Sequence, residues 1–255
     1  MIELYNDDCM KVLKTMKDQS VDLVVTDCPY HIVSGGCRSN DGKNIGGIFA
    51  NTKITSGCLD IYSSNIETGA IFDYNDIEFS EWLPEVYRVL KDGTHCYIMI
   101  NARNLKDLWV EAEKVGFVFQ NILVWDKGNV TPNKWYMNAY ELILMLRKGK
   151  AKNINNMGTS NIIRVQNIIR TKAHPTEKPY QLMQVLIENS TQEGEVCLDP
   201  FMGVGGGGVA CKLLNRSFIG IEIDKKYYDI AYERIHGKPQ NNTFEQISIF
   251  DLIGG

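Results

Sequence analysis

The apolar run from Val21 to Thr26 is followed at once by Asp27-Cys28-Pro29-Tyr30. An apolar run rich in β-branched residues that stops at a breaker predicts a buried parallel strand and its exit loop. Open α/β sheets bind their ligands just beyond the carboxyl ends of such strands. The chain therefore has an acid, a rigid turn and an aromatic ring at the place where an α/β enzyme performs its chemistry.

Strand and helix patterns alternate along most of the chain. Besides a short first strand, they predict strands over 21–25, 94–100, 117–125, 140–146, 196–198 and 218–223, and helices over 9–16, 79–90, 104–115, 179–189, 209–214 and 225–235. This alternation predicts an α/β fold with a mostly parallel sheet and helices on both faces. A length of 255 residues fits one large α/β domain or two small ones.

Two stretches break the alternation. Residues 31–74 are rich in Gly, Ser, Asn and Thr, and they predict a long mobile loop or a small insertion. Residues 147–178 carry a local charge of +7 in a chain whose net charge is −4. The basic residues of this stretch are Arg147, Lys148, Lys150, Lys152, Arg164, Arg170, Lys172 and Lys178, against the single acid Glu177. They form either a solvated loop or a surface that contacts phosphates.

Composition narrows the class of protein. Hydrophobic residues make up 44% of the chain, yet no apolar run approaches the roughly 20 residues that span a membrane. The acidic N-terminus lacks the basic start and apolar stretch of a signal peptide. Seven scattered cysteines without a C-x-x-C pair disfavour a disulfide framework and a zinc ribbon. We therefore predict a cytoplasmic protein with free thiols and no metal site.

A second motif joins a predicted strand to a predicted helix through the glycine-rich segment Cys197–Gly208, and Glu222 follows fourteen residues later at the end of the next strand. Such glycines let backbone N–H groups approach a ligand, and an acid roughly 20 residues beyond the turn is placed to bind ribose hydroxyls. The loop has neither a clean G-x-G-x-x-G nor the Lys-Ser/Thr of a P-loop, which disfavours a dehydrogenase or an ATPase. The pattern indicates a nucleoside-containing cofactor.

Three segments together resemble the β-class of amino-DNA methyltransferases, which use S-adenosylmethionine. Asp27-Cys28-Pro29-Tyr30 is similar to the family's D-P-P-Y, His174–Pro179 to its H-P-x-x-K-P, and Asp199–Gly205 to its D-P-F-x-G-x-G. The catalytic motif precedes the cofactor motif, as in this class. Weaker similarities over residues 4–13, 117–129 and 140–148 extend the resemblance to nearly the whole chain.

The resemblance implies a single Rossmann-like methyltransferase domain over 1–255, with a seven-stranded, mostly parallel sheet and one antiparallel strand near an edge. Target recognition is then expected from 31–74 and from the basic segment 147–178. The residues implied for the cofactor are Asp8, Thr176, Lys178, Asp199, Phe201, Gly203, Gly205 and Glu222. Asp8 has a second interpretation as an N-cap, because a predicted helix begins beside it.

The same resemblance implies methylation of the N6 amine of adenine in DNA. The Asp27 carboxylate and the Cys28 carbonyl each accept one amine hydrogen, Pro29 shapes the turn, and Tyr30 stacks on a base that has left the duplex. The sequence departs from the family twice. Cys28 replaces a proline, which leaves the carbonyl acceptor and gives the thiol a packing role. Gly206-Gly207-Gly208 replaces threonines, which loosens the cofactor loop.

Other functions stay open at this level. N4-cytosine methylation uses the same geometry, although the cytosine enzymes of the family more often carry serine in place of Asp27. Methylation of RNA or protein and an inactive DNA-binding relative are further alternatives. The residues expected to contact DNA are Arg147, Lys148, Lys150, Arg164, Arg170 and Lys172. Recognition is either short, or completed by a partner subunit such as a second copy in a homodimer.

Overall fold

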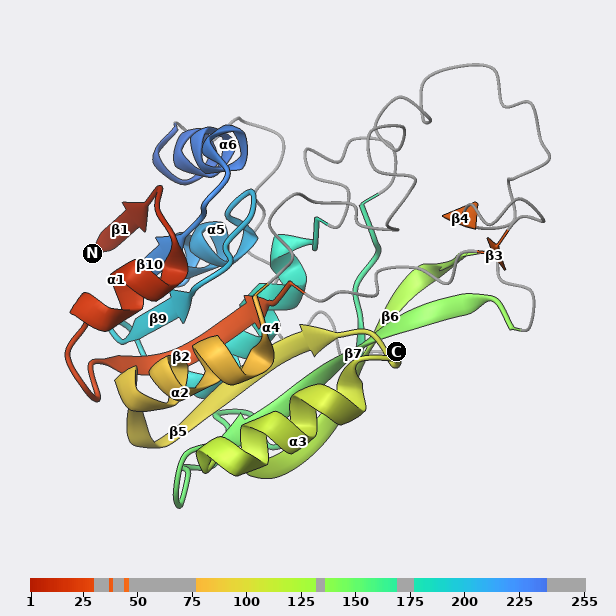
Figure 1. Cartoon of the computed structure of the whole chain (residues 1–255), viewed down its shortest axis with the longest axis horizontal. Helices are drawn as coiled ribbons and strands as arrows, with labels where there is room; N and C mark the ends of the chain where they lie inside the picture. Colours follow the sequence, from red (N-terminus) through yellow and green to blue (C-terminus); the bar gives the residue numbers. More distant parts are fainter. Residues whose placement is uncertain (30–36, 39–43, 46–76, 132–135, 169–176, 238–255) are drawn as a thin grey trace.

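A central sheet organises the computed structural model, which describes residues 1–29, 37–38, 44–45, 77–131, 136–168 and 177–237 (Figure 1). Its strand order is β1-β10-β9-β2-β5-β7-β6-β8. The strands are β1 (Ile2–Tyr5), β2 (Val21–Asp27), β5 (Leu90–Ile100), β6 (Val118–Thr131), β7 (Asn138–Arg147), β8 (Ile162–Arg164), β9 (Val196–Asp199) and β10 (Ser217–Ile221). Every neighbouring pair is parallel except the two that include β7, which confirms a mostly parallel sheet with one antiparallel strand near an edge.

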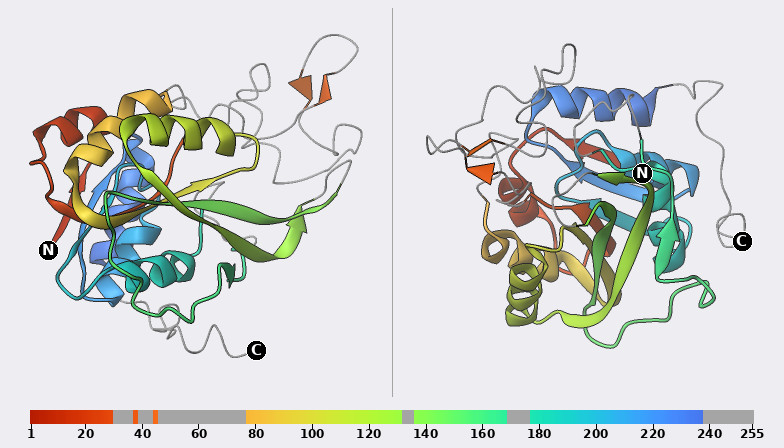
Figure 2. Two further views of the ribbon diagram at one scale, coloured as in Figure 1. Left: turned by 90° about the horizontal axis from the view of Figure 1, so that it is seen from below. Right: turned by 90° about the vertical axis from the view of Figure 1, so that its right-hand side faces the viewer.

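Helices cover both faces of the sheet (Figure 2). One layer holds α1 (Cys9–Thr15), α2 (Phe79–Val89) and α3 (Leu105–Val115), and the other holds α4 (Tyr180–Ser190), α5 (Gly206–Leu213) and α6 (Lys225–His236). Alternate residues of the strands serve the two layers, as side-chain alternation requires. Val24 and Ile98 pack toward α1–α3, whereas Leu23 and Met99 pack toward α4–α6. The two cores confirm the predicted α/β architecture.

The sheet has eight strands within the described residues, so the expectation of seven was wrong. The additional strand is β8, which lies inside the stretch predicted to be a basic loop. It is three residues long and pairs in parallel with β6, where Trp125 lies opposite Ile163. Such a short strand has too few residues to show periodicity in the sequence. Two further short strands, β3 (Cys37–Arg38) and β4 (Asn44–Ile45), pair antiparallel within the 31–74 region, most of which lies outside the described residues.

Helix α5 begins at Gly206, three residues earlier than predicted, so the glycines belong to its first turn. Packing explains why small residues stand there. A Cβ on Gly208 would overlap Ile235 of α6 and would lie 2.9 Å from the Phe218 ring. A Cβ on Gly205 would lie 2.9 Å from Ala231 of the same helix. The glycines therefore let α6 press directly on the loop that precedes α5.

The part of the chain that the structure describes contains no helix long and apolar enough to cross a membrane. The described cysteines Cys9, Cys28, Cys96, Cys197 and Cys211 are buried free thiols.

Candidate active site

Three acids lie at the carboxyl edge of the sheet, where β2, β9 and β10 end. Asp27 is the last residue of β2, Asp199 is the last residue of β9, and Glu222 follows β10. These strands are neighbours in the sheet and run parallel, so their ends meet on one side. The sequence motifs separated by about 170 residues are therefore adjacent in space, as the order of the parallel strands requires.

Asp27 is held by a cation from the third motif. Lys178 donates from Nζ to Asp27 Oδ2 at 2.7 Å, and its Nζ also lies 3.2 Å from Glu141 Oε2. The Lys178 side chain is only 6% exposed, whereas that of Asp27 is 21% exposed. Glu141, on β7, is in turn 3.5 Å from Lys127 of β6. Charges of alternating sign thus link Lys127, Glu141, Lys178 and Asp27 in one row, and solvent still reaches the Asp27 carboxylate.

Cys28 follows Asp27 into the core. Its side chain is buried, and its Sγ lies 3.9 Å from the Met99 carbonyl oxygen. Burial raises the pKa of the Cys28 thiol well above its usual range, with the neighbouring Asp27 charge as a second cause. A thiol that keeps its proton is a poor nucleophile. The packing role expected for Cys28 agrees with this environment, while Tyr30 lies outside the described residues.

The glycine loop between β9 and α5 wraps around Glu222. The Gly203 N–H donates to Glu222 Oε2 at 2.9 Å, and the Asp224 N–H donates to Oε1 at 2.8 Å. Gly203 and Gly205 have φ values of 53° and 79°, which glycine adopts without strain. A Cβ on Gly203 would meet no protein atom within 4 Å, so the loop presents bare backbone to open space. Burial raises the pKa of Glu222, although its backbone hydrogen bonds act in the opposite direction.

Asp199 supports this loop from within. Its Oδ1 accepts hydrogen bonds from the Thr26 hydroxyl at 2.7 Å and from the Phe201 N–H at 3.1 Å. Burial raises the pKa of Asp199 to about 7, and the hydrogen bonds from Thr26 and Phe201 only partly offset that cost. The side chain therefore ties the end of β9 to β2 and shapes the loop rather than projecting from it.

Asp8 and Phe201 complete the described part of the predicted cofactor set. Asp8 caps α1, because its Oδ1 accepts from the Met10 N–H at 2.7 Å. The N-cap interpretation of Asp8 is therefore present in the structure, and it leaves the carboxylate partly exposed. The Phe201 ring packs edge-on against Trp82 of α2, with ring centroids 5.3 Å apart. Thr176 lies outside the described residues.

A family model described as DNA methylase, of the N6/N4 type, matches residues 21–233. The chain belongs to this family of amino-DNA methyltransferases. The chain is 30% identical to the type II methyltransferase M2.DpnII of Streptococcus pneumoniae, over 94% of this chain and 91% of that protein. It is also 30% identical to M.HpaI of Haemophilus parainfluenzae, over 94% and 75% of the two chains.

Solved structures agree with the architecture. The crystal structure of an M1.HpyAVI–SAM complex has a TM-score of 0.64 and 25% identity, and covers 92% of this methyltransferase and 100% of that chain. The cytosine-N4-specific PvuII methyltransferase has a TM-score of 0.67 at 14% identity, with 96% and 88% coverage. That second likeness concerns the fold alone, so the fold does not separate adenine from cytosine enzymes.

The basic segment of the methyltransferase divides between the two edges of the sheet. Arg147, the last residue of β7, pairs with His95 in the middle of β5, whereas Asp27 pairs with Met99 near the end of β5. His95 and Met99 are four residues apart on β5. Arg147 therefore lies about 13 Å from Asp27 along the strand direction, and the strand position of Asp27 is the nearer one to the carboxyl edge. Arg164 lies beside Asp126, on the carboxyl side of that strand position, and is 70% exposed. Arg170 and Lys172 lie outside the described residues.

The Lys148 side chain points into the protein, where it binds backbone carbonyl groups, and it does not face solvent. Its ammonium donates to the carbonyl oxygens of Tyr87 and Leu90, both at 2.8 Å, and lies over the Tyr87 ring. Because its side chain is only 8% exposed, a phosphate contact through Lys148 does not fit the structure. This lysine anchors the start of β5 to the end of β7.

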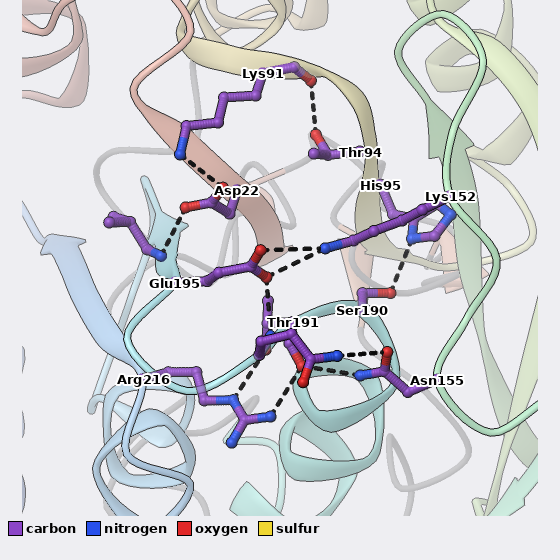
Figure 3. Close-up of polar contacts among 12 residues, drawn as sticks. Asp22, Lys91, Thr94, His95, Lys152, Asn155, Ser190, Thr191, Glu195 and Arg216 are labelled. Carbon is purple, nitrogen blue, oxygen red and sulfur yellow. Dashed lines mark hydrogen bonds and ion pairs between the residues drawn. The ribbon is translucent and has the colours of Figure 1, made fainter.

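Arg147 and Lys150 help to line a cavity of about 470 Å³ between the sheet and α4, and His95 and Tyr97 also belong to its lining. Figure 3 shows the polar contacts that surround the amino edge of the sheet. His95 and Tyr97 both lie within 3.0 Å of the Ser190 hydroxyl, and Lys152 pairs with Glu195 at 3.2 Å. These contacts join β5, α4 and the loop before β9. The polar side chains at the amino edge therefore have a structural role.

Sequence reasoning missed Glu141, Lys127 and Arg234. Glu141 is the single charge among the apolar residues Tyr140–Leu146 of β7, and a charge there calls for a partner once it is partly withdrawn from water. That signal was available in the sequence. Arg234 donates to Glu177 Oε1 at 2.8 Å and to the Val204 carbonyl at 3.0 Å. No local pattern distinguishes Arg234 from the other charges of α6.

Proposed function

We propose that this DNA methyltransferase methylates the N6 amine of adenine with S-adenosylmethionine as the methyl donor. The observation that supports the proposal most directly is the Lys178–Asp27 pair at 2.7 Å, at the same sheet edge as the glycine loop and Glu222. The pair joins the segment that resembles H-P-x-x-K-P to Asp27-Cys28-Pro29-Tyr30, and the glycine loop is the remaining motif of the three. S-adenosylmethionine supplies an activated methyl group when bound.

The described residues fit this cofactor. The loop around Gly203 offers backbone N–H groups and space that no protein side chain fills. Each oxygen of Glu222 accepts one backbone N–H and keeps a further lone pair, so the carboxylate is placed to accept ribose hydroxyls. We keep Asp8 as a proposed contact of the cofactor's adenine, and Phe201 and Gly205 as residues proposed to line the cofactor. Asp199 is proposed to act through the loop that it supports.

Asp27 and the Cys28 carbonyl are proposed to accept the two hydrogens of the target amine. That amine is a weak nucleophile because its lone pair is delocalised into the ring. Lys178 binds one carboxylate oxygen and orients the group, and a carboxylate has lone pairs beyond that bond. Hydrogen bonds to charged groups contribute about 1.5–3 kcal/mol, or roughly one to two decades in rate. Tyr30 is proposed to stack on the flipped base.

Adenine is favoured over cytosine because an aspartate stands at position 27, where the resembling cytosine enzymes more often have serine. The test is incubation of the protein with duplex DNA and labelled cofactor, followed by digestion to nucleosides. N6-methyladenine supports the proposal, and N4-methylcytosine would replace it with the alternative. Label found in RNA and absent from DNA would overturn it.

Asp27→Ala should lower turnover about 100-fold while cofactor binding persists, because the amine acceptor is lost. Isothermal titration with the cofactor and single-turnover methylation measure the two properties separately. Turnover near the wild-type rate in this variant would refute the proposed role of Asp27.

A further inference from the structure

Arg234 joins the cofactor loop to the segment that holds the catalytic acid. A single nitrogen, Nη1, donates to the Val204 carbonyl at 3.0 Å and to Glu177 Oε1 at 2.8 Å. Val204 lies between the two positive-φ glycines of the loop. Glu177 directly precedes Lys178, whose ammonium holds Asp27. Arg234 therefore contacts both halves of the proposed site from α6.

The two groups that Arg234 contacts, the Glu177 carboxylate and the Val204 peptide, belong to buried residues, so a displacement of one can be passed on to the other. The Glu177 side chain is 5% exposed, and its carboxylate is paired with the Arg234 guanidinium. Charge-assisted hydrogen bonds of this kind are the stronger ones in proteins. Val204 itself is buried, so its peptide orientation follows the groups that bind it. A shift of the loop would move Arg234, and a shift of Arg234 would move Glu177.

A second contact couples the same two segments. A Cβ on Gly206 would lie 3.4 Å from the Lys178 carbonyl oxygen, so the first turn of α5 and the backbone of Lys178 are in close approach. Helix α6 packs against the loop through Ala231 and Ile235, which face Gly205 and Gly208. Densely packed segments move together rather than independently.

We propose that Arg234 is a positioning residue that links the conformation of the cofactor loop to the placement of Lys178 and, through it, of Asp27. This inference rests on the proposed function and adds to it a coupling between the cofactor half and the amine half of the site. Residues 203–205 would hold the cofactor, so the orientation of the Val204 peptide would be passed to Arg234 and, through Glu177, to the start of α4. Lys178 holds Asp27 in the orientation that accepts the amine.

The test separates cofactor affinity from turnover. Glu177→Gln removes the ion pair and leaves the bond from Arg234 to Val204, so cofactor Kd should stay within about twofold while kcat falls about 10-fold. Arg234→Met removes both bonds, so Kd and kcat should each worsen about 10-fold.

Arg234→Lys keeps a cation at this position and should recover at least half of that loss. The double variant Arg234→Met/Glu177→Gln leaves no buried unpaired charge and serves where the single variant folds poorly.

Lys225→Met is the matched control, because it removes one cation from the exposed face of α6, where Lys225 pairs with Asp229. It should leave both Kd and kcat unchanged. In a double-mutant cycle, Arg234→Met should cost less than about threefold in kcat once Lys178→Met is present, since the coupling acts through Lys178. Full additivity of the two losses, or an Arg234→Met enzyme that behaves like Lys225→Met, would overturn the inference. Methylation by the wild-type enzyme tests the proposed function separately from these comparisons.

Discussion

The two edges of the sheet both carry lysine–carboxylate pairs between segments that are distant in sequence, yet the pairs differ in what they hold. At the amino edge Lys91 meets Asp22 at 2.7 Å and Lys152 meets Glu195 at 3.2 Å. The same acids also accept backbone N–H groups, Asp22 from Val196 and Glu195 from Gln192. These contacts tie the amino ends of β2, β5 and β9 to one another and to the loop after β7 (Figure 3).

At the carboxyl edge the cation is buried, and the acid is more exposed than the cation that it binds. Lys178 is 6% exposed and Asp27 is 21% exposed, whereas at the amino edge Lys152 is 37% exposed and Glu195 is 28% exposed. Near Asp27 stand two further acids with raised pKa values, Asp199 and Glu222. Perturbed acids grouped at a strand end are typical of functional sites. The comparison teaches that the presence of an ion pair does not mark a site, whereas its edge and its pattern of burial do.

The largest expected effect separates these two kinds of pair. Lys178→Met should lower kcat about 100-fold, because Asp27 loses the cation that orients it. Lys152→Met, the matched change at the amino edge, should leave kcat within about twofold. Single-turnover methylation at saturating cofactor and DNA measures both variants. Equal losses in the two variants would contradict the contrast between the edges.

The next effect concerns stability and pH. Asp199 has a folded-state pKa of about 7 against an ordinary value of 3.8, so the folded protein keeps this proton while the unfolded chain releases it. Its contribution therefore makes the free energy of unfolding fall as pH rises from about 4 to about 7. The shift sets an upper bound of about 4 kcal/mol, at about 1.4 kcal/mol per pKa unit.

Asp199→Asn resembles the neutral carboxyl and removes this titration. The stability of the variant relative to the wild type should therefore increase by about 2 kcal/mol between pH 4 and pH 8, roughly half of that bound. Urea unfolding at a series of pH values measures the difference. A difference that stays constant with pH would show that Asp199 titrates alike in both states.

A smaller effect tests DNA contact at the two edges. Arg164→Glu should weaken DNA binding about 10-fold and reduce its salt slope by about 1, because Arg164 is exposed at the carboxyl edge. Lys150→Glu produces the same change of net charge just beyond the end of β7, at the amino edge. It should have little effect on DNA affinity. Fluorescence anisotropy over a range of salt concentrations compares them. If Lys150→Glu weakens binding as much, DNA also contacts the amino side.

The smallest effect lies within the carboxyl edge itself. Cys28→Ala should keep kcat within about twofold, because the proposed acceptor is the backbone carbonyl and the thiol is buried and protonated. The free energy of unfolding should fall by about 1 kcal/mol for the lost packing. Methylation kinetics and urea unfolding measure the two quantities. A large loss of kcat at unchanged stability would give the thiol a part in the chemistry.

Much of the fold could be predicted from local patterns. The apolar run that forms β2 and the stop signal at Gly116, which has a φ of 115°, gave a strand and a helix end close to the observed ones. β8 could not be predicted, because three residues carry no period and the strand depends on β6 as a partner. The basic segment 147–178 is likewise continuous in the sequence. In the structure its residues lie at both edges of the sheet, because the chain runs from Arg147 at the amino edge to β8 at the carboxyl edge.

The sequence by itself determined the order of the elements, the acid at the end of β2 and the glycine loop followed by Glu222, because each depends on neighbouring residues. The tertiary structure decided which charges meet. Lys178 is 151 residues from Asp27, and Arg234 is 57 residues from Glu177. Pairings over such distances follow from strand order and from the packing of α6 on the glycine loop. The proposed catalytic acid was therefore present in the sequence, but the residues that hold it were selected by the fold.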